Sequence, residues 1–160
     1  PAGTTLVIEK DEMLGHTGRE IPTMLDYRTH ISKESMFNTP PVFPIYVSML
    51  TLRWLKENGG IEWIEKRNNQ KADLLYNFID TSPIFEGSAA IEDRSTMNAT
   101  FLLTDNSLES EFNKMCLEGG INGLKGHRSV GGYRASMYNA MPLESVQVLV
   151  DIMKELERKG

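Results

Sequence analysis

Two long helical patterns, separated only by the glycine pair at residues 59–60, constrain the fold of this chain more than any other feature. Over residues 42–58, apolar side chains recur at steps of three and four, which is the spacing of one helix face. The glycine pair ends this helix, and a second helix is expected from Ile61 to about Asp80. The polar stretch at residues 65–71 is expected to be a solvated face of the second helix.

The rest of the chain alternates short apolar runs with two further helical patterns. Strands are expected over residues 4–9, 84–91, 97–104, 121–125 and 133–139, and helices over residues 106–118 and from Pro142 onward. Helices packed on one face of a small sheet make an α+β layer domain. We therefore expect residues 1–60 to be the tail of a larger α/β domain, and residues 61–160 to be a compact α+β domain.

Composition excludes several classes of function. Lys and Arg number 17 against 22 Asp and Glu, a net charge of −5, so no nucleic-acid surface is expected, because phosphate binding needs clustered positive charge. The longest apolar run is too short to span a membrane. Cys116 is the single cysteine, which favours a reducing cytoplasm and a place in the core. The three histidines lie far apart in sequence, so no metal site is expected.

Asn38 and Thr39 precede a Pro40-Pro41 pair at the start of the first helical pattern. A helix N-terminus carries partial positive charge and suits phosphate, and here the side chains of Asn38 and Thr39 must supply donors that the prolines lack. The alternative is that Asn38 or Thr39 merely caps the helix, with the prolines in its first turn. Spacing alone favours the cap.

A basic segment at residues 125–134 is the second candidate site. Lys125, His127, Arg128 and Arg134 fall within it, and three glycines interrupt it. Arginine offers a planar fork that matches carboxylate and phosphate, and histidine adds a second donor. Arg134 is the strongest candidate, because it begins an alternating strand pattern that fixes its direction. The alternative is a solvated hairpin with incidental surface charge. No paired carboxylates, Ser/His/Asp order or phosphate loop accompany it, so no catalytic residue is assigned in this chain.

These stretches closely resemble phosphoserine aminotransferases, which are class V aminotransferases. The matching segments are residues 36–41, 54–56, 59–60, 69–72, 74–76, 123–128, 131–132, 134–136 and 138–144. The resemblance covers essentially all 160 residues. It implies the end of the large domain and the small C-terminal domain of a fold type I transferase that depends on pyridoxal phosphate.

The resemblance also implies an activity. The family moves an amino group from glutamate to 3-phosphohydroxypyruvate, giving phosphoserine and 2-oxoglutarate in serine biosynthesis. In many bacteria the same enzyme serves vitamin B6 biosynthesis. Family members are cytoplasmic homodimers with sites shared across the interface.

Carried over position by position, the resemblance assigns five residues. Asn38 and Thr39 match the pair that binds the cofactor phosphate of the other subunit. Arg134 matches the arginine that binds the substrate α-carboxylate. His127 and Arg128 match residues that cross the interface to the substrate phosphate or side-chain carboxylate.

The family's Schiff-base lysine matches no lysine of this chain. Its motif ends in Pro-Ala-Gly, which resembles residues 1–3, so that lysine is expected before Pro1. Alone the chain should be inactive, and it is expected to work with its own N-terminal portion. Two alternatives remain: a non-catalytic anion-binding fragment, or a different aminotransferase of the same fold for a dianionic substrate.

Overall fold

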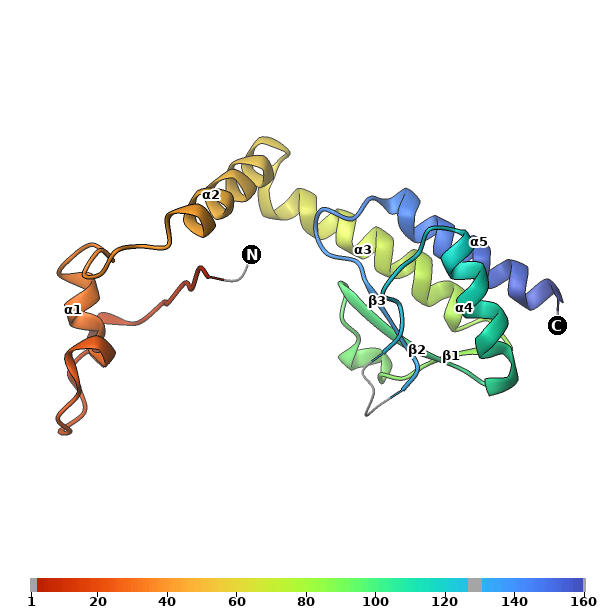
Figure 1. Cartoon of the computed structure of the whole chain (residues 1–160), viewed down its shortest axis with the longest axis horizontal. Coiled ribbons are helices and arrows are strands. Elements are labelled where there is room, and N and C mark those ends of the chain that lie inside the picture. Colours follow the sequence, from red (N-terminus) through yellow and green to blue (C-terminus); the bar gives the residue numbers. More distant parts are fainter. Residues whose placement is uncertain (1–2, 127–130, 160) are drawn as a thin grey trace. The chain divides into compact units, whose positions relative to one another are not determined.

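The computed structural model describes residues 3–126 and 131–159, and the chain divides into two compact units (Figure 1). Unit 1 is Pro1–Asn58 and unit 2 is Gly59–Gly160. The division falls two residues before the boundary that the sequence predicts at residue 60. The assignment of the two parts to domains of a larger enzyme stays a prediction.

Unit 1 is built from short helical pieces and one long helix. Its elements are η1 (Asp11–Met13), η2 (Thr23–Leu25), α1 (Tyr27–Ile31) and α2 (Val42–Glu57). None of its described residues is buried. The strand expected at residues 4–9 is wrong: Leu6 and Ile8 are 83% and 86% exposed in an extended segment. A β-branched run becomes a strand only beside a hydrogen-bonding neighbour, and no described segment pairs with this one.

Helix α2 confirms the first helical pattern, but it starts differently from the expectation. Its N-cap residue is Pro41, and no side chain caps it, so Asn38 and Thr39 are not the cap. Pro40 and Pro41 precede the helix, and Pro44 lies in its first turn instead. Proline is tolerated there, because the N–H it lacks has no partner within the helix.

Unit 2 is a three-stranded antiparallel sheet with helices on one face, which confirms the α+β expectation (Figure 1). In chain order it consists of α3 (Gly60–Ile79), β1 (Phe85–Gly87), η3 (Ile91–Asp93), β2 (Asn98–Leu103), η4 (Asn106–Leu108), α4 (Glu109–Glu118), β3 (Tyr133–Ser136) and α5 (Leu143–Lys159). The strand order is β1-β2-β3. Helix α3 packs on β1 and β2, and α5 packs against α3 and α4.

The strands expected at residues 84–91 and 133–139 are shorter in the structure, as β1 and β3, and one expected strand is absent. Residues 121–125 form no strand, and only Lys125 makes an isolated bridge, with Tyr133. Gly120 and Gly123 adopt φ of +79° and +74°, which breaks the extended backbone that a strand needs. The segment still contacts the sheet, because the N–H of Arg134 donates to the carbonyl of Leu124 at 2.7 Å.

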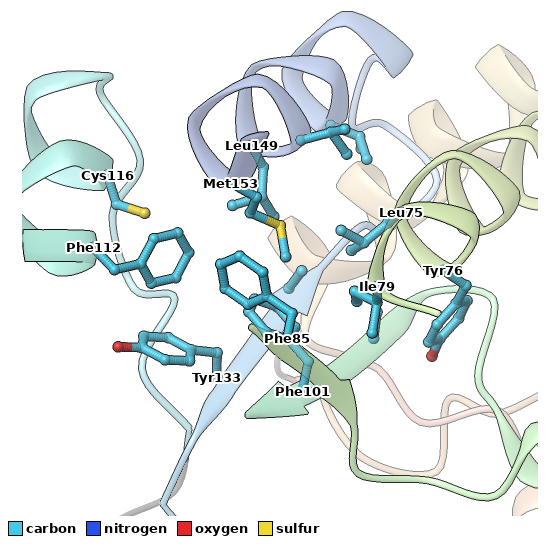
Figure 2. Packing of buried hydrophobic residues seen from close by; sticks show 14 of the residues in the cluster. Leu75, Tyr76, Ile79, Phe85, Phe101, Phe112, Cys116, Tyr133, Leu149 and Met153 are labelled. Atoms are coloured by element: carbon cyan, nitrogen blue, oxygen red, sulfur yellow. The ribbon is translucent and has the colours of Figure 1, made fainter. Parts of the chain in front are cut away.

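An aromatic cluster fills the space between the sheet and the helices (Figure 2). The Tyr133 ring stacks on Phe101 at 5.4 Å between centroids and meets Phe112 edge-on at 5.0 Å. Cys116 lies buried beside these rings, as expected. Because side chains alternate along a strand, the burial of Tyr133 and Ala135 places Arg134 on the face of the sheet away from the helices.

The polar middle of α3 is only partly the solvated face that the sequence predicts. Glu65, Lys66 and Gln70 are exposed, but Asn68 and Lys71 are 8% and 1% exposed. These two positions lie on the apolar face of the helix, and each finds hydrogen-bond partners there, as described below.

Candidate functional site

Arg134 lies in the middle of β3, with Thr100 of β2 as its pairing partner. Its side chain is exposed, and among the described residues no carboxylate forms an ion pair with it. Its backbone is held on both sides, by the β2 ladder and by the bond to Leu124. A fixed backbone and an uncompensated guanidinium are what an anion site requires of an arginine.

A pocket of about 340 Å³ lies beside this arginine. It is bounded by residues 120–124, by β3 and by the first turns of α5. Its floor is mostly apolar, with Met137, Val146 and Leu149 among the lining residues, and Arg134 is the one cation in the described lining. A pocket of this size and mostly apolar lining suits the carbon chain of a small organic molecule, and Arg134 at its edge is the group that can bind a negative charge.

Lys71 and Asn68 hold the chain that leaves β3. The Nζ atom of Lys71 donates to the carbonyls of Met137 and Tyr138 at 2.9 and 2.8 Å. The Nδ2 atom of Asn68 donates to Oδ1 of Asn139 at 2.8 Å. Burial, and secondarily the charge of Arg67, lower the pKa of Lys71.

The sequence analysis missed Lys71 and Asn68, although a signal was present. Positions 64, 68, 71, 75 and 79 follow one helical stripe, and all five are buried. Periodicity therefore places both polar residues on the core-facing side of α3, where a buried polar group needs a partner. The polar composition of residues 65–71 instead favoured a solvated face.

Asn38 and Thr39 lie in unit 1, in the turn before α2, and both are exposed. The Nδ2 atom of Asn38 donates weakly to the sulfur of Met24 at 3.6 Å. Since Pro41 is the N-cap, neither side chain is engaged in capping the helix. An amide and a hydroxyl before a 16-residue helix are a donor set that fits a phosphate group. The two units are described separately, so the structure does not bring this pair together with Arg134.

His127 and Arg128 lie outside the described residues, and their roles stay predictions. The residues that flank them are described. The N–H of Gly126 donates to the carbonyl of Gly132 at 2.8 Å. A side chain at Gly126 would collide with the carbonyl of Gly131, and Gly132 adopts φ of +65° against the carbonyl of Phe101. Both positions therefore require glycine, because no side chain fits between these backbone segments.

Two further properties bear on the site. Within residues 3–126 and 131–159, no three His, Cys, Asp or Glu side chains gather closely enough to hold a metal ion. No helix in that same part of the chain combines the length and the apolar character needed to cross a membrane.

Comparison with known proteins places the chain in a family. The sequence profile of the family Aminotransferase class-V matches residues 1–149. A phosphoserine aminotransferase from Flavobacterium psychrophilum is 68% identical over 99% of this chain and 45% of its own length. One from Flavobacterium johnsoniae is 63% identical with the same coverage. The chain therefore spans about half the length of the curated relatives it matches.

Solved structures agree with the sequence matches. Phosphoserine aminotransferase from Bacillus circulans subsp. alkalophilus matches 87% of this chain and 39% of its own, with a TM-score of 0.82 and 46% identity. The structure of phosphoserine aminotransferase from Trichomonas vaginalis with bound PLP matches 84% of this chain and 39% of its own, with a TM-score of 0.76 and 38% identity. With a profile match over most of its length and agreement in both sequence and fold, this chain belongs to the class V aminotransferase family.

Proposed function

We propose that this chain is the C-terminal portion of a phosphoserine aminotransferase that uses pyridoxal phosphate. The enzyme transfers an amino group from glutamate to 3-phosphohydroxypyruvate and yields phosphoserine and 2-oxoglutarate. The observation that carries the proposal is Arg134, an exposed arginine on a fixed strand beside an organic-sized pocket, in a chain 68% identical to a protein of that name.

Arg134 binds the α-carboxylate that both substrates share. Its planar fork donates two parallel hydrogen bonds to a carboxylate, which sets orientation as well as affinity. The pocket beside it gives the substrate carbon chain a mostly apolar surface. Orientation of this kind raises the rate of the reaction, because the reacting carbon no longer has to search for the correct geometry.

His127 and Arg128 bind the second anionic end of the substrate. That end is the phosphate of 3-phosphohydroxypyruvate or the side-chain carboxylate of glutamate. A substrate with a neutral side chain has no use for these two residues, so their presence favours a dianionic substrate. The phosphorylated precursor in vitamin B6 biosynthesis carries the same two kinds of anion and is a second substrate to assay.

Asn38 and Thr39 bind the phosphate of the cofactor in the other subunit of a homodimer. Their amide and hydroxyl donate hydrogen bonds, and the dipole of α2 adds partial positive charge. Bound pyridoxal phosphate supplies the electron sink for amino transfer. The lysine that holds it belongs to the N-terminal portion of the enzyme.

The exposed apolar side chains of unit 1 support a partner for this chain. Leu6, Ile8 and Phe43 are 83%, 86% and 74% exposed, which is unusual for a surface that faces water. We propose that the N-terminal portion and the second subunit cover them. The lone Cys116, free and buried, is consistent with work in the cytoplasm.

Turnover by the complete enzyme tests the proposal. This chain is produced together with the N-terminal portion, and phosphoserine is quantified after addition of glutamate and 3-phosphohydroxypyruvate. We expect phosphoserine to accumulate only when both substrates are present. Turnover of pyruvate or oxaloacetate in preference to 3-phosphohydroxypyruvate identifies a different aminotransferase. Anion binding without any turnover identifies a non-catalytic fragment.

A further inference from the structure

We propose that Lys71 is a positioning residue for Arg134: it fixes the chain that leaves β3 and thereby holds the arginine toward the substrate. The substrate part of this inference rests on the proposed function. Lys71 is 1% exposed and projects from α3, whereas Arg134 lies on β3 in the sheet. The two are linked by the carbonyls of Met137 and Tyr138, three and four residues beyond Arg134.

Three consecutive residues after β3 are tied to α3. Lys71 holds the carbonyls of Met137 and Tyr138 at 2.9 and 2.8 Å. One helical turn earlier, Asn68 holds the side chain of Asn139 at 2.8 Å. The two bonds from Lys71 reach backbone atoms rather than mobile side-chain ends, so they fix where the strand leaves the sheet, and the side-chain bond from Asn68 adds to them.

The position of the strand end decides where Arg134 points. Strand β3 has four residues, and its register with β2 pairs Arg134 with Thr100. A shift of one residue moves every side chain of a strand to the opposite face. Arg134 would then point into the core, and Tyr133 would leave it. So short a strand has few ladder bonds of its own to prevent this shift, and bonds from α3 supply a further constraint.

A lysine suits this role better than an apolar residue. Beyond β3 the carbonyls of Met137 and Tyr138 have left the sheet ladder, and an ammonium group has enough protons to serve both at once. Among the described residues no carboxylate forms an ion pair with Lys71, so charge pairing is not its purpose. Its hydrogen bonds go to the residues that directly follow β3, the strand of Arg134.

Lys71→Met in the complete enzyme tests the inference, with Lys66→Met as the matched control. Methionine keeps the length of the side chain but loses all three donors, and Lys66 is an exposed lysine on the same helix. We measure KM and kcat for glutamate, and the Kd for glutarate, an unreactive dicarboxylate, by calorimetry. Lys71→Met should raise KM and Kd about 10-fold or more, with a smaller change in kcat, because a misplaced Arg134 loses its charge-assisted contact with the carboxylate. Lys66→Met should match the wild type.

Hydrogen exchange gives a readout that does not depend on activity. In Lys71→Met the amides of β3 should exchange faster, whereas those of β1 should be unchanged. If Lys71→Met does not fold, Asn68→Ala breaks the neighbouring bond to Asn139 and should raise the Kd for glutarate about threefold in the same direction.

The possible failures can be told apart. Wild-type Kd and wild-type β3 exchange in Lys71→Met overturn the inference and leave the proposed function intact. A lower melting temperature with unchanged KM and Kd also overturns it, because the lysine is then only structural. If the wild-type enzyme neither turns over 3-phosphohydroxypyruvate nor binds glutarate, the proposed function is wrong, and the substrate part of the inference is wrong with it.

Discussion

The core of unit 2 should lose stability steeply above about pH 9, because two of its buried groups resist ionisation. Burial raises the pKa of the Cys116 thiol from 9.0 to about 11. Burial, helped by the charges of Glu109 and Cys116, raises the pKa of Tyr133 from 10.0 to about 12. Both groups keep their protons in the folded chain at a pH where the unfolded chain has released them.

The sign and size of the effect follow from linkage. A raised pKa in the folded state contributes stability that is fully present below the unfolded pKa and is lost as the pH rises through the folded pKa. Each pH unit in that window is worth about 1.4 kcal/mol for each group. By about pH 11 the contribution of Cys116 falls by about 2.3 kcal/mol and that of Tyr133 by about 1.4 kcal/mol. Their sum is a large share of the stability of a typical domain.

Lys71 acts in the opposite direction. Burial lowers the pKa of its ammonium below 10.5, so the cost of burying the charge is relieved as the pH rises toward that value. The slope of the free energy of unfolding against pH in the wild type is therefore the sum of opposing contributions. The difference between the wild type and single variants isolates the thiol and the phenol.

Urea unfolding followed by far-ultraviolet circular dichroism, between about pH 8 and pH 11 with a reducing agent, measures that difference. Cys116→Ala should lose about 2.3 kcal/mol less than the wild type over this range, and Tyr133→Phe about 1.4 kcal/mol less. Tyr138→Phe removes a phenol that is 57% exposed and should follow the wild type. Slopes for Cys116→Ala and Tyr133→Phe that equal the wild-type slope would refute the reasoning.

Other substitutions also have defined outcomes. Arg128→Ala in the complete enzyme should raise KM for 3-phosphohydroxypyruvate more than KM for glutamate. Equal effects on the two KM values would show that Arg128 does not bind the substrate phosphate. Asn38→Ala and Thr39→Ala should each weaken cofactor binding by about 1.5–3 kcal/mol, the value of a hydrogen bond to a charged group, as read from cofactor absorbance. Gly132→Ala should destabilise the chain by about 1–3 kcal/mol in urea, since its φ is +65° and its Cβ would meet the carbonyl of Phe101 at 2.8 Å. Gly131→Ala shares a positive φ but has open space, so it should cost less, and equal costs would contradict the steric argument.

Local patterns were sufficient for most of the helical structure. The apolar spacing and the glycine pair at residues 59–60 correctly predict α2 and α3, and the helix expected from Pro142 onward is α5. These features depend on residues three or four apart, which the sequence displays directly. The direction of Arg134 away from the core is also confirmed, because alternation along a strand sets the direction of each side chain.

The errors concern partners that are distant in sequence. Residues 4–9 have strand-like composition, but no described strand lies beside them. Lys71 looks like one of a run of solvated residues, and its acceptors are 66 and 67 positions away. Neither a neighbouring strand nor a carbonyl across the core can be located from local spacing. The resemblance to a family assigned candidate site residues, but it gave no sign that Lys71 of α3 bonds the chain just beyond β3.

The KM for glutamate of the complete enzyme, compared between Arg134→Ala and Arg158→Ala, tests the central claim most directly. Arg158 is also exposed, but it lies near the end of α5 and pairs with Glu155. The account predicts an increase of about 10-fold or more for Arg134→Ala, the loss of a charge-assisted bidentate contact, and no change for Arg158→Ala. A KM for Arg134→Ala equal to that of the wild type would contradict the assignment of β3 as the substrate-binding strand.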